Sequence, residues 1–131
     1  MRPAVPAVVL FCSFALAACS GSATSSSESA SAASGAANTL KVTATGDACQ
    51  LSATSLAAGR VTVEATSTAG GEAEIYLYGQ DNGAYTKIMG EAEGLTSGLT
   101  KTFTADVPAG TYEVKCEVSG KQDVRVPITV G

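Results

Sequence analysis

Val107-Pro-Ala-Gly-Thr-Tyr-Glu-Val-Lys-Cys-Glu-Val118 begins with a turn and continues with apolar and polar residues in alternation. Successive side chains of a β-strand point to opposite faces of its sheet, so one apolar face is predicted to hold Tyr112, Val114, Cys116 and Val118. The thiol of Cys116 should therefore face the core, where it packs, forms a disulfide or binds a metal. The other cysteine with similar neighbours is Cys49, in Ala48-Cys-Gln-Leu51.

The same alternation recurs through most of residues 39–131. Asp81-Asn-Gly83 predicts a hairpin because Asn and Gly tolerate positive φ, with a return strand over 85–89 and a loop over 90–94. Pro127 predicts an edge or bulge position for the last strand. Seven to eight short strands, with turn signals about every 8 to 12 residues, predict an all-β, antiparallel β-sandwich that is immunoglobulin-like in outline.

The composition excludes several kinds of chemistry. The 131 residues contain no histidine, so a Ser-His-Asp or Cys-His nucleophile, a His-ligated zinc site and a blue-copper centre cannot be built. The net charge is −4 and no run of basic residues is present, which argues against nucleic acid as a partner. Any metal site must use sulfur, carboxylate and carbonyl donors.

The N-terminal segment has the features of an export signal. Arg2 is followed by a short apolar region and then by Leu16-Ala-Ala-Cys19, which resembles the bacterial lipobox. We expect residues 1–18 to be a lipoprotein signal peptide and Cys19 to carry the lipid. The alternatives are an ordinary signal peptide cut nearby and an uncleaved anchor. The lipid would hold the exported protein on the outer face of the cytoplasmic membrane, or on the outer membrane if the host has one.

The next segment, residues 19–38, is rich in serine and alanine and has no large apolar residue. Such a composition offers no burial to offset the entropy of ordering, so we expect a flexible tether between the lipidated cysteine and a domain at 39–131.

Four further blocks, together with the first, carry a resemblance to a known family. They are Val42-Thr-Ala-Thr-Gly-Asp-Ala-Cys-Gln50, Leu56-Ala-Ala-Gly-Arg-Val-Thr-Val63, Glu74-Ile-Tyr-Leu-Tyr-Gly79 and Met89-Gly-Glu-Ala-Glu-Gly94. In order and spacing over residues 40–130, they resemble the cupredoxin-like N-terminal domain of EfeO-type iron-uptake proteins, here as a stand-alone bacterial lipoprotein. The resemblance implies a Greek-key cupredoxin-like sandwich that handles copper or ferric iron outside the cytoplasm, with iron-uptake components as partners.

The resemblance also implies a set of metal ligands, namely Cys49, Glu74 and Cys116, with Glu91 and Glu93 in the following loop. One departure lies after Cys116, where Glu117-Val-Ser-Gly-Lys121 has neither the proline nor the methionine expected there. That difference speaks against copper in particular.

Two interpretations of the cysteine pair remain open at this level. Export and an even number of remaining cysteines favour a disulfide, which would contribute roughly 4 kcal/mol in the chain-entropy model. A thiolate metal site is the alternative. If the disulfide forms, Glu74, Glu91 and Glu93 remain as hard oxygen donors, which suit ferric iron or calcium better than cuprous copper.

The sequence therefore predicts a non-catalytic, membrane-anchored protein that binds or relays iron or copper. A surface lipoprotein whose disulfide-stapled sandwich is a scaffold for protein contacts is the alternative. An oxidoreductase with Cys49 and Cys116 as a redox pair is less favoured, because both alternate with apolar residues. Tyr76, Tyr78 and Tyr85 either cover the sheet or form an aromatic surface for a partner.

Overall fold

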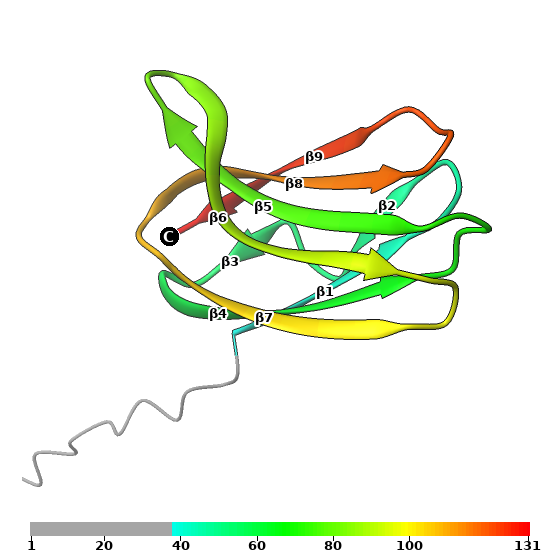
Figure 1. The fold of residues 1–131 in the computed structure, drawn as a ribbon. Coiled ribbons are helices and arrows are strands. Elements are labelled where there is room, and N and C mark those ends of the chain that lie inside the picture. The colour runs from blue at the N-terminus through cyan, green and yellow to red at the C-terminus, as the bar shows by residue number, and fades with distance from the viewer. Residues whose placement is uncertain (1–37) are drawn as a thin grey trace, which may run out of the picture. The chain divides into compact units, whose positions relative to one another are not determined.

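Nine β-strands follow one another in residues 38–131, the part of the chain that this computed structural model describes (Figure 1). Each strand forms where the sequence alternates apolar and polar residues, or where a short polar segment joins two such runs. The strands are β1 (Thr39–Ala44), β2 (Cys49–Leu51), β3 (Ser55–Leu56), β4 (Gly59–Ser67), β5 (Ala73–Asp81), β6 (Ala84–Leu95), β7 (Thr100–Val107), β8 (Gly110–Val118) and β9 (Val124–Val130).

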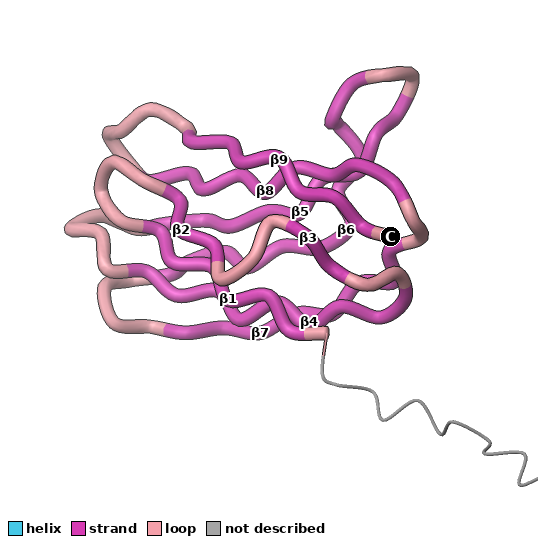
Figure 2. The backbone as a smooth tube through the Cα atoms, turned by 180° about the vertical axis from the view of Figure 1, so that it is seen from behind, coloured by secondary structure: helices cyan, strands magenta, loops and turns pink. Residues whose placement is uncertain are grey.

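The strands form two sheets that pack face to face, as predicted. The first has four strands in the order β2-β1-β4-β7, and the second has five in the order β3-β9-β8-β5-β6. Figure 2 shows from behind how β2 lies beside β1 and how β3 lies beside β9. The fold is thus an all-β sandwich.

Two details of the prediction were wrong. The described residues contain nine strands rather than seven to eight, because β3 has only two residues and no alternation to reveal it. The sheets are also not wholly antiparallel, since β1 pairs with β4 and β3 pairs with β9 in parallel. Parallel pairing follows from the path of the chain, which passes from β1 through β2 and β3 before β4 returns beside β1.

The hairpin between β5 and β6 has the predicted turn. Asn82 has a φ of 50° and Gly83 a φ of 83°, the pair of positive values that a two-residue type I′ turn requires. The flanking residues Asp81 and Ala84 pair with each other. The turn type matches the twist of the strands and sets the register at this end of the hairpin.

The predicted loop over 90–94 was wrong, since these residues belong to β6. The pairing of β6 with β5 is interrupted by three register shifts, at each of which β6 has one residue more than β5. Such β-bulges allow glycine-rich and charged segments to remain in a strand. Gly90 also leaves room for the Phe103 ring, which packs where β7 covers this half of β6.

The core lies between the two sheets and contains the inward apolar side chains of both. Its largest fully buried members are Leu40, Ile75, Leu77, Leu95, Val42, Val61, Val63, Val107, Val114 and Cys116. Pro127 lies in the part of β9 that β3 does not reach, because β3 pairs only with Thr129 and Val130. The predicted edge position of Pro127 is therefore confirmed. Proline has no N–H, and at this open edge no neighbouring strand needs one.

Candidate functional site

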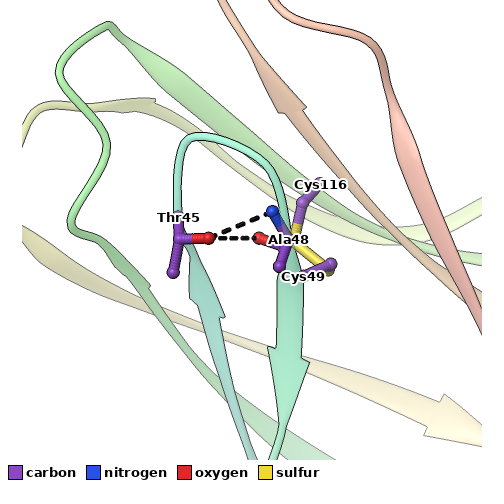
Figure 3. Close-up of a disulfide and its surroundings, with 4 residues drawn as sticks. All are labelled: Thr45, Ala48, Cys49 and Cys116. Carbon is purple, nitrogen blue, oxygen red and sulfur yellow. Dashed lines mark hydrogen bonds between the residues drawn. A yellow bond between two sulfur atoms is a disulfide. The ribbon is translucent and has the colours of Figure 1, made fainter.

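Cys49 and Cys116 are joined by a disulfide with an S–S distance of 2.04 Å and a Cα–Cα distance of 5.5 Å (Figure 3). The bond connects β2 in the four-stranded sheet to β8 in the five-stranded sheet. Thr45 shapes the turn that brings Cys49 into place, because its hydroxyl bonds both the N–H and the carbonyl of Ala48. Both cysteines are buried, at 8% and 2% exposure.

Of the two interpretations of this pair, the structure contains the disulfide. Neither sulfur is a thiolate, so neither can act as the predicted metal ligand in this state. Their burial also separates them from solvent, as expected for a structural bridge rather than an exposed redox pair.

The predicted carboxylate ligands lie on the other side of the sheet. Ile75 pairs with Cys116 and points into the core, so the adjacent Glu74 points outward. Glu91 pairs with Tyr76 and also faces outward. The predicted ligand set is thereby divided between the interior, which holds both cysteines, and the outer surface, which holds the glutamates.

An acidic row crosses this outer surface, formed by Asp123, Glu117, Glu74 and Glu93. Glu117 pairs directly with Glu74 on the neighbouring strand, and Glu93 lies in the bulge on the other side of Glu74. Lys115, a largely buried lysine, contacts Glu117 at 2.7 Å and Asp123 at 2.9 Å. Like charges directly opposite one another are destabilising. Lys115 brings one positive charge to four carboxylates, so it offsets only part of the repulsion in the row.

These charges alter the titration of their neighbours. The Tyr76 hydroxyl donates a hydrogen bond to Glu74, and this bond, burial and the nearby carboxylates raise the pKa of Tyr76 above its ordinary value. Hydrogen bonds to Asp123 and Glu117 likewise raise the pKa of Lys115. Both shifts indicate an outer surface of negative potential around the acidic row.

A second feature of the same surface is a tyrosine face, defined by Tyr76, Tyr78, Ile88, Lys115 and Arg125. The two tyrosine rings stack with centroids 5.6 Å apart. The ammonium of Lys115 lies 5.5 Å from the centre of the Tyr76 ring, and the guanidinium of Arg125 lies 5.3 Å from that of Tyr78. Ile88 pairs with Tyr78 and is 50% exposed, which makes it the most exposed large apolar residue described.

Sequence reasoning identified the tyrosines but missed the cations beside them. Glu113 holds Arg125 in an ion pair, and the same contact raises the pKa of Arg125. The alternating pattern of residues 113–117 places these charges on an outer face. Alternation does not predict that β8 lies next to β5, and so it could not show that these cations lie beside the tyrosine rings.

The donor set does not fit a copper site of the blue type. Histidine is absent from the sequence, and the two cysteines of the described region are bonded to each other. Within residues 38–131 no group of three or more cysteine, aspartate or glutamate side chains is arranged to hold a metal ion. Only hard oxygen donors remain on the outer surface.

The predicted signal peptide at 1–18, the predicted lipidation site Cys19 and all but the last residue of the predicted tether at 19–38 lie outside the described residues. No helix within residues 38–131 is long and apolar enough to cross a membrane.

Comparison with known proteins supports the fold. No family model matches the sequence, and no curated protein matches it. The dithionite-reduced auracyanin of the photosynthetic bacterium Roseiflexus castenholzii is 17% identical, with a TM-score of 0.54 over 74% of this chain and 99% of that one. Auracyanin A, a "blue" copper protein of Chloroflexus aurantiacus, is 19% identical, with a TM-score of 0.51 over 71% of this chain and 98% of that one. At this identity the likeness establishes the architecture, and the described domain is a cupredoxin-like β-sandwich.

Proposed function

We propose that this protein is a non-catalytic binding module, exported and tethered to a membrane through lipid on Cys19, that contacts a partner protein through its tyrosine face. One observation carries the proposal: two stacked tyrosines, each with a cation over its ring, lie beside an exposed isoleucine. Tyrosine and arginine are enriched at protein interfaces and at their energetic hot spots.

The ion pairs make this face rigid before any partner arrives. Lys115 is fixed by two carboxylates and Arg125 by Glu113, so the cations that lie over the tyrosine rings have few rotamers to lose on binding. Pre-ordered side chains reduce the entropic cost of association. The disulfide adds to this rigidity, because it fixes β8 against the opposite sheet. Components of an iron-uptake system are the partners that the family resemblance implies.

Site-specific photo-crosslinking in the native host tests this proposal. A photoreactive phenylalanine analogue at position 88 of the full chain should yield a discrete adduct, and Tyr78→Ser in the same chain should reduce its yield. The control places the analogue at Thr102, which is exposed on the outer face of the opposite sheet. Equal adducts from both positions, or none from position 88, would contradict the proposal.

A second candidate function is binding of a hard cation such as Fe(III), which retains the predicted metal role with a reduced donor set. The acidic row favours it, because carboxylates on adjacent strands attract cations and Lys115 neutralises only part of their charge. The donors would be Glu74 and Glu93 of the acidic row, or the neighbouring Glu91 of β6; because the described residues contain no preassembled group of three, an ion would bind through one or two of these carboxylates and water. Carboxylates suit ferric iron or calcium.

Equilibrium dialysis against Fe(III)-citrate and Ca²⁺ separates the two functions. If the second holds, Glu74→Gln should weaken binding by about tenfold, equivalent to roughly 1.4 kcal/mol. Glu64→Gln, on the outer face of the other sheet, should have no effect. If both variants bind the cation equally, the acidic row is not the metal site. That outcome would not bear on the first function, which the crosslinking experiment tests separately.

A further inference from the structure

We propose that a cleft beneath the β5–β6 hairpin binds a small apolar carboxylate of the N-acyl amino acid type. The cleft has a volume of about 370 Å³, and its lining includes Gly79, Lys87, Met89, Asp106, Pro108 and Tyr112. It lies at the start of β8, whereas Cys116 lies near the other end of that strand. The site is therefore separate from the disulfide, and Gly79 and Tyr112 of its lining face the inner side of the sheet.

The hairpin overhangs the sandwich because its neighbours end before it does. The pairing of β5 with β8 stops at Tyr78, whereas β5 continues to pair with β6 as far as Asp81. Figure 1 shows this hairpin projecting away from the two sheets. The inner face of residues 79–81 and of the strand opposite them is consequently not covered by the core, and it forms one wall of the cleft.

Two of the bulges in β6 determine which side chains line that wall. Gly79 pairs with Lys87 and Tyr78 pairs with Ile88, so Lys87 shares the inner face with Gly79 while Ile88 lies outside. The extra residue Met89 packs against Gly79, where an added Cβ would lie only 3.1 Å from the methionine sulfur. Bulges commonly re-aim side chains next to functional sites, and here they bring a cation and a thioether to the same cleft.

The floor of the cleft is apolar and fixed. Tyr112 is only 6% exposed, and its hydroxyl donates a 2.8 Å hydrogen bond to the carbonyl of Pro108. Met89 is partly buried and also packs against the core. An apolar group of a ligand would therefore rest on a preformed surface, and its burial would contribute about 25 cal/mol per Å².

Lys87 indicates the charge of the ligand. Among residues 38–131 it is the single lysine or arginine that makes neither an ion pair nor a hydrogen bond. The other six each contact a carboxylate or a carbonyl, in a protein whose acidic residues outnumber its basic ones. An unpaired ammonium at the edge of an apolar cleft is suited to a carboxylate, with which it forms a charge-assisted hydrogen bond.

Asp106 also borders the cleft, but its side chain is 76% exposed and points outward, because it alternates with the buried Ala105 and Val107. Arg60 Nε donates to its Oδ1 at 3.4 Å, which offsets its negative charge beside a carboxylate ligand. A ligand with a carboxylate and an apolar side chain, such as an N-acyl amino acid, satisfies the two features that Lys87 and the apolar floor provide. The volume is near the lower end of the range for small-molecule sites, which suits a ligand of this size.

Two sources share this chemistry: a free N-acyl amino acid and the C-terminus of a peptide. Met89 allows both to be tested, because Met1 is the only other methionine of the chain. The full chain with ¹³C-methyl-labelled methionine is titrated with N-acetyl-leucine, with its uncharged amide and with a tripeptide that ends in leucine. We expect a saturable shift of the Met89 methyl signal with N-acetyl-leucine, and about tenfold weaker binding of the amide.

Lys87→Gln is the decisive variant, since it removes the charge of an exposed side chain that has no partner to lose. It should weaken the binding of N-acetyl-leucine about tenfold. Lys41→Gln, on the opposite sheet, should bind N-acetyl-leucine as tightly as the parent protein does. If the tripeptide binds more tightly than N-acetyl-leucine, the ligand is the C-terminus of a peptide. If it binds equally or more weakly, the ligand is a free N-acyl amino acid. The proposal is overturned if no titration saturates, if acid and amide bind equally, or if Lys87→Gln binds like Lys41→Gln.

Discussion

Phe103 lies directly over the backbone of Gly90, where the two sheets meet along β6 and β7. A Cβ added at Gly90 would be 2.5 Å from one ring carbon of Phe103 and 2.7 Å from another. Gly90→Ala should therefore force the ring to move and lower the free energy of unfolding by about 1–3 kcal/mol. Urea denaturation measures this loss.

Gly70→Ala provides the matched control, because a Cβ there meets no atom within 4 Å and the backbone φ is not in the positive range. We expect it to leave stability unchanged or to raise it by a few tenths of a kcal/mol, about the gain from a less flexible unfolded chain. Equal midpoints for the two variants would show that Phe103 does not require the glycine.

Tyr76 should make stability fall at high pH. Its pKa is raised in the folded protein, whereas an unfolded tyrosine ionises near about pH 10. The resulting stabilisation is complete below that pH and is lost as the pH rises through the higher pKa of the folded state. In a tyrosinate absorbance titration, Glu74→Gln should shift the ionisation of Tyr76 toward lower pH, and Glu64→Gln should not. No difference between these variants would contradict the assigned cause.

At the scale of the elements, β6 is an edge strand that its bulges protect. A flat edge strand offers unpaired backbone groups to other chains, and bulges and lysines are common means of preventing that pairing. One bulge places Thr86 between the pairs formed by Tyr85 and Lys87. Along the second half of the strand, Lys101 donates to the Glu93 carbonyl at 2.6 Å and covers part of the edge.

Deletion of Thr86 should straighten this strand and promote association between molecules. Sedimentation velocity over a range of concentrations should show more self-association than in the parent protein, whereas Thr86→Ser should keep the bulge and behave like the parent. Circular dichroism establishes that the deletion variant is folded. A folded deletion variant without added association would show that the bulge does not protect the edge.

The sequence predicted most elements because alternation is strong where one face of a strand is buried. It failed at residues 90–94, where Gly90 and Gly94 suggest a loop and where the ring of Phe103 and a bulge instead keep the chain in a strand. It also missed β3, which is too short for any pattern to show. In these places contacts distant in sequence outweigh local preference.

The candidate sites were predictable to different extents. The partner of Cys116 could be inferred, because Cys49 alone shared its apolar surroundings, but the sequence left open whether the pair forms a disulfide or a thiolate metal site. The acidic row could not be inferred, because it depends on which strand lies next to β5, and the positions of Glu93 and Lys87 depend on the bulged register of β6 against β5. A shift of one residue in that register would exchange the inner and outer faces.

At the scale of the whole molecule, the disulfide joins two sheets whose apolar core is small. The bond closes a loop with a sequence separation of 67. Cys49→Ser/Cys116→Ser should therefore lower the free energy of unfolding by about 2–5 kcal/mol. The measurement is chemical denaturation with and without reductant, and the reductant should destabilise the parent protein but not the double variant. Equal stability of the parent with and without reductant would show that the bond contributes little.

The same bond determines how the domain would respond to mechanical force. A pull applied at Thr39 and resisted at Gly131 would first extend the chain before Cys49 and the chain after Cys116. Beyond that point the load passes through the sulfur atoms and bypasses residues 50–115, which include β4 to β7 and carry both the β5–β6 hairpin and the tyrosines of β5. A module held by its N-terminal end could thus be unravelled from both ends, with β1 pulled from β4 and β9 from β8, while residues 50–115 stay outside the covalent path of the load.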